Sequence, residues 1–152
     1  MRKYYIALLS LIIQMSFGQT NKVTKKQLSE NFKKKDSYTR QWITCNTDST
    51  FYKSDTLYFH DRLNYYRCKK YIIWGFDNSK SFYQVEGENF NNYDGVKLIT
   101  ENDWYKIKIV EEENETLLNI YNQKKLIESF IVHELGYNEK EKWNRLTLIR
   151  KK

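Results

Sequence analysis

The sequence predicts an all-β protein, an antiparallel meander of about eight or nine short strands. Aromatic residues make up 16% of the chain, with 13 Tyr, and their rings favour the pleated, half-buried surface of a strand. After residue 38, apolar and polar side chains alternate with the period of two that a half-buried strand requires. Alanine occurs once, at Ala7, which argues against a bundle of helices.

The expected strands are separated by short turns, and no crossover helix is visible between them. They cover residues 37–45, 55–60, 71–76, 81–87, 96–100, 104–110, 117–121, 125–135 and 144–150. The clearest is 104–110, where Tyr105, Ile107 and Ile109 alternate with lysines. A meander of this many strands must close into a barrel or split into two packed sheets to protect its edges.

The first 18 residues are expected to be a signal peptide. Arg2 and Lys3 precede an apolar run over 5–13 that is too short to span a bilayer. Cleavage is expected between Gly18 and Gln19, and it would lower the net charge from +7 to +5 by removing two basic residues and no acidic ones. The sequence therefore predicts an exported protein of the periplasm or extracellular medium.

A polar, lysine-rich leader is expected over 19–37, ahead of a barrel domain at 38–152. Leu28 and Phe32 lie four residues apart, the spacing of a short amphipathic helix over 25–35. The same composition is also typical of a disordered leader, and the sequence leaves both alternatives open.

Cys45 and Cys68 are the two cysteines of the chain, and in an exported protein they are expected to form a disulfide. Closing a loop of about 24 residues is worth ~3 kcal/mol in the chain-entropy model. A metal site would need more ligands, and only His60 and His133, far apart in sequence, are available. One difficulty stays open, because a simple meander places the two cysteines at opposite ends of the sheet.

No catalytic, cofactor-binding or metal-binding constellation is recognisable, so the protein is expected not to be an enzyme and to need no cofactor. His60 and Asp61 are sequence neighbours, and on a strand their side chains point to opposite faces. A catalytic triad requires the carboxylate to reach the imidazole. Both histidines are expected to be surface residues.

The strand patterns at 37–45, 55–60, 71–76, 104–110 and 145–150 resemble those of the small lipocalin-like proteins exported by Gram-negative bacteria. Trp42 matches the tryptophan on the first lipocalin strand, and Arg40 stands where the family has glycine. The resemblance implies that the Trp42 indole packs at the barrel base, with a late-strand arginine, Arg145 or Arg150, lying across the ring.

The resemblance further implies an eight-stranded barrel whose interior admits a small apolar ligand. Several aromatic and aliphatic side chains either line such a cavity or fill a solid core, namely Trp74, Phe76, Tyr105, Ile107 and Tyr121. The sequence does not decide between a hollow and a filled interior.

The leading functional hypothesis is an exported, monomeric, lipocalin-like barrel that binds a small apolar molecule. An alternative is a protein-interaction module, an inhibitor or immunity-type partner of another envelope protein, because the surface is basic and rich in tyrosine. A third is a carbohydrate-binding β-sandwich with exposed rings at Tyr52, Tyr58, Tyr65 and Tyr66. Neither a nucleic-acid partner nor a transmembrane segment in the mature chain is expected.

Overall fold

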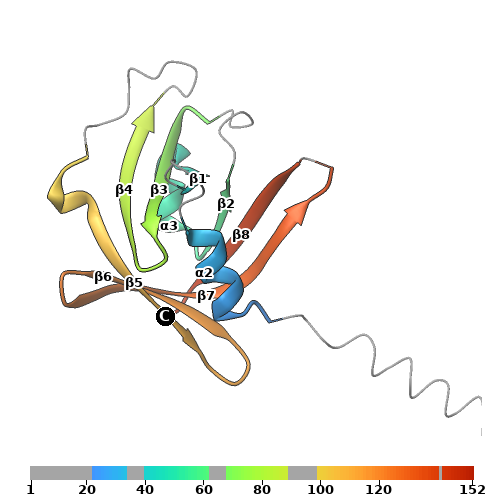
Figure 1. Cartoon of the computed structure of the whole chain (residues 1–152). Helices are drawn as coiled ribbons and strands as arrows, with labels where there is room; N and C mark the ends of the chain where they lie inside the picture. Colours follow the sequence, from blue (N-terminus) through green and yellow to red (C-terminus); the bar gives the residue numbers. More distant parts are fainter. Residues whose placement is uncertain (1–21, 34–39, 62–67, 89–98, 141) are drawn as a thin grey trace, which may run out of the picture.

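The structure, a computed structural model, describes residues 22–33, 40–61, 68–88, 99–140 and 142–152. Within these ranges the chain forms eight antiparallel strands that close into one barrel (Figure 1). The strands are β1 (Arg40–Cys45), β2 (Thr56–His60), β3 (Lys70–Asn78), β4 (Ser81–Glu88), β5 (Trp104–Glu111), β6 (Thr116–Asn122), β7 (Lys125–Asn138) and β8 (Trp143–Arg150). The helices are α2 (Lys25–Phe32), η1 (Thr47–Ser49), α3 (Thr50–Lys53) and η4 (Glu101–Asp103). The predicted all-β antiparallel barrel is confirmed.

The strand order around the barrel is β1-β2-β8-β7-β6-β5-β4-β3. From β3 to β8 each strand pairs with the next along the chain, as a meander predicts. The simple meander is wrong for the first three strands, because β1 lies between β2 and β3. Its ladder with β3 runs over the whole of β1, whereas its ladder with β2 holds one residue pair, Ile43 and His60.

The strand expected at 96–100 is not formed where the structure describes it. Residues 96–98 lie outside the described ranges, and Ile99 and Thr100 precede η4 without belonging to a strand. The described part of the chain therefore has eight strands, the lower of the two predicted numbers.

Helix α2 packs at the end of the barrel where β1 begins and β3 ends. A capping box starts the helix: Thr24 Oγ1 accepts a hydrogen bond from Gln27 N at 3.2 Å, and Gln27 Oε1 accepts one from Thr24 N at 2.7 Å. Leu28 and Phe32, one turn apart, are fully buried, and the Phe32 ring stacks on Phe76 with 4.3 Å between centroids. Residues 25–32 of the segment expected to be a leader are thus helical, and Leu28 and Phe32 contribute to the core.

The opposite end of the barrel is covered by the short helix α3. Phe51 is buried and packs edge-on against Phe59 and Trp74, with centroids 6.3 and 6.2 Å apart. Arg150, at the end of β8, donates a hydrogen bond to the Phe51 carbonyl, and its guanidinium lies 5.3 Å from the centroid of the Phe130 ring. This cation therefore links the helix to the barrel wall.

Buried side chains fill the interior between the two helices. Trp74 is near its centre, with its ring 4.8 Å from that of Phe82 and its Nε1 donating to Gln84 Oε1 at 2.8 Å. Phe76 and Ile107 belong to the same cluster. These three residues, Trp74, Phe76 and Ile107, were expected either to line a ligand cavity or to form a core, and in the structure they form the core.

Trp42 is buried at the α2 end of this core, but its cationic neighbour differs from the prediction. The Arg40 guanidinium lies over the indole, 5.8 Å from the ring centroid. The expectation that Arg145 or Arg150 covers the ring is wrong. Arg145 pairs with Glu134 at 2.6 Å, and Arg150 lies at the opposite end of the barrel. The physical reason is topological, since β2 separates β8 from β1.

On the outer face of the β3–β4 hairpin, two tyrosine rings lie over two glycines. Gly75 is paired with Tyr83, and Gly87 with Tyr71. A Cβ atom built on Gly75 would lie 2.0 Å from Tyr83 Cζ, and one on Gly87 would lie 2.3 Å from Tyr71 Cζ. Each ring therefore occupies the space that a side chain on the partner strand would need.

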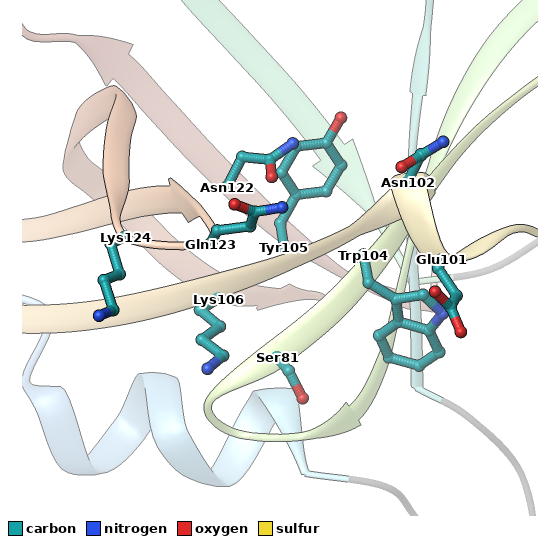
Figure 2. Close-up of a pocket in the computed structure, with 9 residues that line it drawn as sticks. All are labelled: Ser81, Glu101, Asn102, Trp104, Tyr105, Lys106, Asn122, Gln123 and Lys124. Carbon is teal, nitrogen blue, oxygen red and sulfur yellow. The ribbon is translucent and has the colours of Figure 1, made fainter.

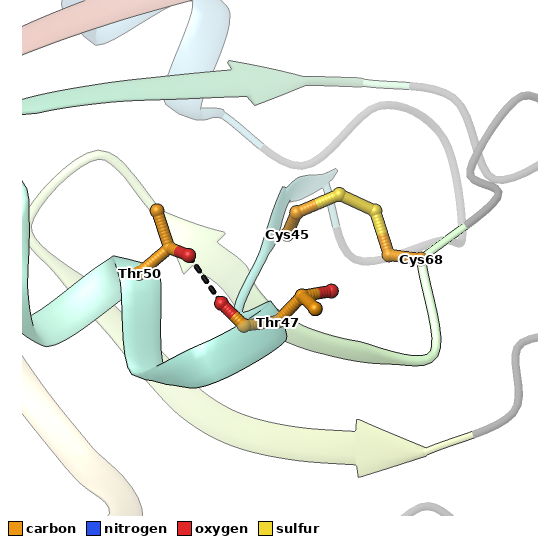
Figure 3. Close-up of a disulfide and its surroundings, with 4 residues drawn as sticks. All are labelled: Cys45, Thr47, Thr50 and Cys68. Atoms are coloured by element: carbon orange, nitrogen blue, oxygen red, sulfur yellow. Dashed lines mark hydrogen bonds between the residues drawn. A yellow bond between two sulfur atoms is a disulfide. The ribbon is translucent and has the colours of Figure 1, made fainter.

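The pairing of β1 with β3 brings the two cysteines together. Cys45 ends β1 opposite Tyr71, near the start of β3, and Cys68 lies two residues before that strand. Their Cα atoms are 5.6 Å apart and a disulfide joins them (Figure 3). The structure thus resolves the difficulty that a simple meander raised.

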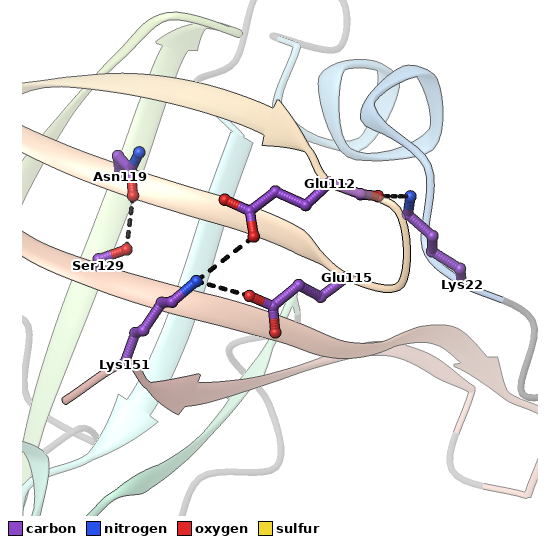
Figure 4. Close-up of polar contacts among 6 residues, drawn as sticks. All are labelled: Lys22, Glu112, Glu115, Asn119, Ser129 and Lys151. Atoms are coloured by element: carbon purple, nitrogen blue, oxygen red, sulfur yellow. Dashed lines mark hydrogen bonds and ion pairs between the residues drawn. The ribbon is translucent and has the colours of Figure 1, made fainter.

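The two ends of the described chain meet at the turn between β5 and β6 (Figure 4). Lys22 Nζ donates to the Glu112 carbonyl, and Lys151 Nζ lies 2.6 Å from the Glu115 carboxylate. The hydrogen bond from Lys151 lowers the pKa of Glu115 below its usual value. The turn between β5 and β6 therefore anchors the first and last described segments, through a backbone carbonyl for Lys22 and through carboxylates for Lys151.

Candidate functional site

An open pocket of about 470 Å³ lies along β5, and we call it the β5 pocket (Figure 2). Its size falls within the range of small-molecule sites, roughly 300–1,000 Å³. The lining residues come from the start of β4, from η4 and β5, and from the β6–β7 turn. They are Ser81, Glu101, Asn102, Trp104, Tyr105, Lys106, Asn122, Gln123 and Lys124.

Two neighbouring aromatic residues give the pocket its apolar surface. Trp104 is 40% exposed and packs edge-on against Tyr83, with 5.6 Å between centroids. Tyr105 follows it on β5 and points the other way, so that its ring stacks on the core residue Phe82 at 5.5 Å. Because Tyr83 is itself packed over Gly75, the indole rests on a fixed part of the wall.

The η4 turn positions Glu101 and Asn102 at one rim of the pocket. Thr100 begins this turn with a capping box, in which the Asp103 carboxylate accepts from Thr100 N and Thr100 Oγ1, both at 2.7 Å. The turn then leads directly into Trp104.

The β6–β7 turn forms the other rim. Asn122 pairs with Lys125, so Gln123 and Lys124 are the two residues of a tight hairpin turn. Gln123 has φ 54°, in the left-handed region that non-glycine residues seldom adopt. Strained backbone of this kind is found preferentially at binding sites.

Most polar side chains of the pocket have no partner in the described part of the chain, although Ser81 Oγ accepts a hydrogen bond from Asn78 Nδ2 at 2.9 Å. Among the described residues, the side-chain amides of Asn102, Asn122 and Gln123 make no hydrogen bond. The ammonium groups of Lys106 and Lys124 likewise form no ion pair in the described part of the chain. An amide offers both donors and an acceptor, so these groups are available to a ligand.

Close to the pocket, Tyr52 of α3 donates a hydrogen bond from its hydroxyl to the Glu86 carboxylate. Partial burial and this hydrogen bond raise the pKa of the Tyr52 phenol well above its ordinary value. The phenol therefore stays protonated across the physiological range and fixes α3 against β4.

Of the residues singled out from the sequence, Tyr105 is the one that lines the pocket. Tyr121 lies on β6 opposite Lys106, half-buried and outside the set of lining residues. The other lining residues were missed. Trp104 carried a signal, because it stands on the lysine-bearing face of the 104–110 strand pattern, where a large ring has no core to join.

The two histidines lie on different strands and form no joint site. His60 is half-buried, with its ring 5.0 Å from that of Trp143, and His133 is exposed. Asp61 accepts a hydrogen bond from Asn144 N at 2.7 Å and pairs with Arg40 at 2.6 Å. In the described part of the chain, no group of three or more His, Cys, Asp or Glu side chains is arranged to hold a metal ion.

The tyrosines named for the aromatic platform of a sandwich are described only in part. Tyr52 and Tyr58 are exposed but lie on α3 and β2, and Tyr65 and Tyr66 fall outside the described residues. The sandwich architecture is wrong, because the strands close into a single barrel.

Comparison with models of protein families, with curated proteins and with solved structures found no match. Across the described ranges, no helix has the length and apolar character needed to cross a membrane. The eight-stranded antiparallel barrel is consistent with a lipocalin-like fold, and membership of that family stays a prediction.

Proposed function

We propose that this chain is an exported, non-enzymatic, lipocalin-like β-barrel that binds a small ligand in the β5 pocket. The observation that carries the proposal is the meeting of the exposed Trp104 ring and the half-buried Tyr105 ring with unpartnered amides in one pocket of about 470 Å³. A few converging polar groups beside aromatic rings are typical of small-molecule sites.

The placement of the ligand follows from the packing of the barrel. The interior holds fully buried rings such as Trp74 and Phe76, and α2 and α3 cover its two ends. An apolar molecule inside the barrel would have to displace these side chains from their buried contacts, which costs free energy. The open pocket on β5 requires no such displacement.

Binding rather than catalysis is favoured by the chemistry of the lining. Glu101 is the one carboxylate among the lining residues, and no histidine or cysteine stands beside it. General acid–base catalysis usually employs a positioned pair of titratable groups. We therefore assign no catalytic residue and no cofactor.

Export is supported by the Cys45–Cys68 disulfide, since such bonds persist in oxidising compartments. The expected signal peptide at 1–18 lies outside the described residues. Secretion of the chain to the periplasm or medium, with cleavage after Gly18, is the corresponding proposal.

The experiment is an NMR screen of the purified protein with a library of small polar compounds, read from side-chain amide and indole N–H signals. Compounds that bind are expected to shift the signals of Trp104, Asn122 and Gln123. Trp104→Ala is expected to lower the binding affinity of these compounds at least tenfold, or by about 1.4 kcal/mol, because it removes the ring surface. Tyr137→Ala is the matched control, because Tyr137 is an exposed ring on β7 outside the pocket. A library that shifts no pocket signal contradicts the binding function.

A second candidate is a protein-interaction module. Tyr58 on β2 and Tyr137 on β7 are both 54% exposed, and β8 lies between their strands. Exposed tyrosines are enriched at interfaces. The test is whether the wild type captures a defined envelope protein and whether a folded Tyr58→Ala variant fails to capture it. That result would favour the interaction function over ligand binding in the β5 pocket.

A further inference from the structure

We infer that the β5 pocket recognises an anionic saccharide, with the sugar ring on Trp104 and the acidic group beside Lys106 and Lys124. This inference rests on the proposed binding function and names the class of ligand. It concerns the shared chemistry of sugars that carry a carboxylate or a phosphate.

The aromatic and amide groups together favour a sugar over a lipid or an aromatic compound. A sugar ring has a flat C–H face that packs on an indole, and part of the Trp104 ring is open to solvent. Its hydroxyl groups both donate and accept hydrogen bonds. The amides of Asn102, Asn122 and Gln123 offer the matching acceptors and donors from both rims of the pocket.

Local turns order the backbone that carries two of these amides. Asn102 is held by the capped η4 turn, and Gln123 by a two-residue turn with a left-handed φ of 54°. An ordered backbone limits the conformational freedom that these residues lose on binding, which favours a polar ligand that would otherwise prefer water.

The charges of the pocket favour an anion. Two lysines and one glutamate line it, so its formal charge is positive. Lys106 and Lys124 have no acidic partner among the described residues, whereas Lys70 and Lys151 each pair with a glutamate. Unpaired ammonium groups at a pocket are free to bind the acidic group of a ligand.

The charges are also separated across the pocket. In Figure 2 the two ammonium groups lie on the side of Ser81, and the Glu101 carboxylate lies on the side of Trp104. A sugar stacked on the indole would therefore direct its acidic group away from Glu101 and toward the lysines. In the opposite orientation the acidic group of the sugar would lie beside the Glu101 carboxylate, and the repulsion between the two negative charges disfavours it.

The test is isothermal titration calorimetry of the purified protein with four probes: glucuronate, glucose 6-phosphate, glucose and acetate. At low salt the two anionic sugars are expected to bind about tenfold more tightly than glucose, since each partly exposed lysine contributes a few-fold. The advantage is expected to shrink with added salt because the groups are solvent-accessible.

The lysine variants separate the anion from the sugar. Lys106→Met with Lys124→Met is expected to remove the preference for the anionic sugars, so that their affinities fall to within about twofold of the affinity that the same variant has for glucose. Lys108→Met is the control, because Lys108 lies on the same face of β5 and does not line the pocket.

The outcomes distinguish the inference from the function on which it rests. Glucose binding as tightly as the anionic sugars would overturn the inference and leave the binding function in place. Acetate binding as tightly as glucuronate would also overturn it, because the site would then take an ion without a sugar. If none of the four probes binds while other compounds shift the pocket signals in the NMR screen, the inference falls alone.

Discussion

At the scale of single residues, a missing Cβ atom shapes the wall beside the pocket. Gly75 leaves the space that the Tyr83 ring occupies, and Tyr83 in turn packs against Trp104. The hydroxyl of Tyr83 also accepts a long hydrogen bond from Gln41 Nε2 at 3.4 Å. The position of the exposed indole thus depends on a glycine on another strand.

Gly75→Ala is expected to destabilise the protein by about 1–3 kcal/mol, because the new methyl group forces the Tyr83 ring out of place. Urea denaturation followed by tryptophan fluorescence measures the change. Gly136→Ala is the matched control: a Cβ atom there meets nothing within 4 Å, so stability is expected to hold or rise by about 0.4–1 kcal/mol. Equal losses in the two variants would mean that the Tyr83 ring does not depend on the space at Gly75.

At the scale of elements, α2 behaves as part of the barrel core. Its buried residues Leu28 and Phe32 join the central cluster, and Thr116 Oγ1 donates to the Val23 carbonyl at 2.6 Å just before the helix. Lys25 N donates to the Glu111 carboxylate at 2.8 Å. The helix is therefore bound to the barrel by apolar packing and by hydrogen bonds from β5 and β6.

Phe32→Ala is expected to cost about 3–5 kcal/mol, since it removes a fully buried ring stacked on Phe76 and leaves a cavity. Lys26→Ala, an exposed position on the same helix, controls for helix propensity and is expected to change stability by less than about 0.5 kcal/mol. Chemical denaturation of both variants measures the difference. A Phe32→Ala protein as stable as the Lys26→Ala protein would show that α2 does not belong to the folded core.

At the scale of the whole molecule, the disulfide fixes the part of the barrel whose topology departs from a meander. It joins the end of β1 to Cys68, two residues before β3, beside the ladder between β1 and β3. The β1–β2 seam holds one residue pair, so the β1–β3 side carries most of the strand pairing of β1.

Replacing both cysteines, Cys45→Ala with Cys68→Ala, is expected to lower the stability by about 3 kcal/mol through loop-closure entropy. For a chain of this length the loss corresponds to a melting temperature lower by about 6–12 °C, measured by circular dichroism. Reductant is expected to shift the wild type toward the value of the double variant and to leave that variant unchanged. A wild type that melts identically with and without reductant would show that the bond is not formed.

The strand pattern was predictable from the sequence because alternation is a local property. The strand expected over 104–110 lies within a residue of β5. The helix over α2 was one of two alternatives that the spacing of Leu28 and Phe32 allowed. Its burial against Phe76 is a long-range contact, which local pattern cannot reveal.

The candidate site was mostly hidden from the sequence. Of its lining residues Tyr105 alone was singled out, because Ser81, the η4 turn and the β6–β7 turn are far apart along the chain. The arginine over Trp42 was also misassigned, since the choice between Arg40 and a late-strand arginine depends on which strand lies beside β1.

The sequence by itself determined that the chain is an antiparallel β protein, and it predicts an export signal. Composition, alternation and charge are local properties that can be read directly from the order of the residues. Only the tertiary structure decided the order of the first three strands, the filling of the barrel interior and the existence of the β5 pocket. Those features depend on pairings between distant segments, whose free energies are set by long-range packing against β3 and α2 rather than by local preference.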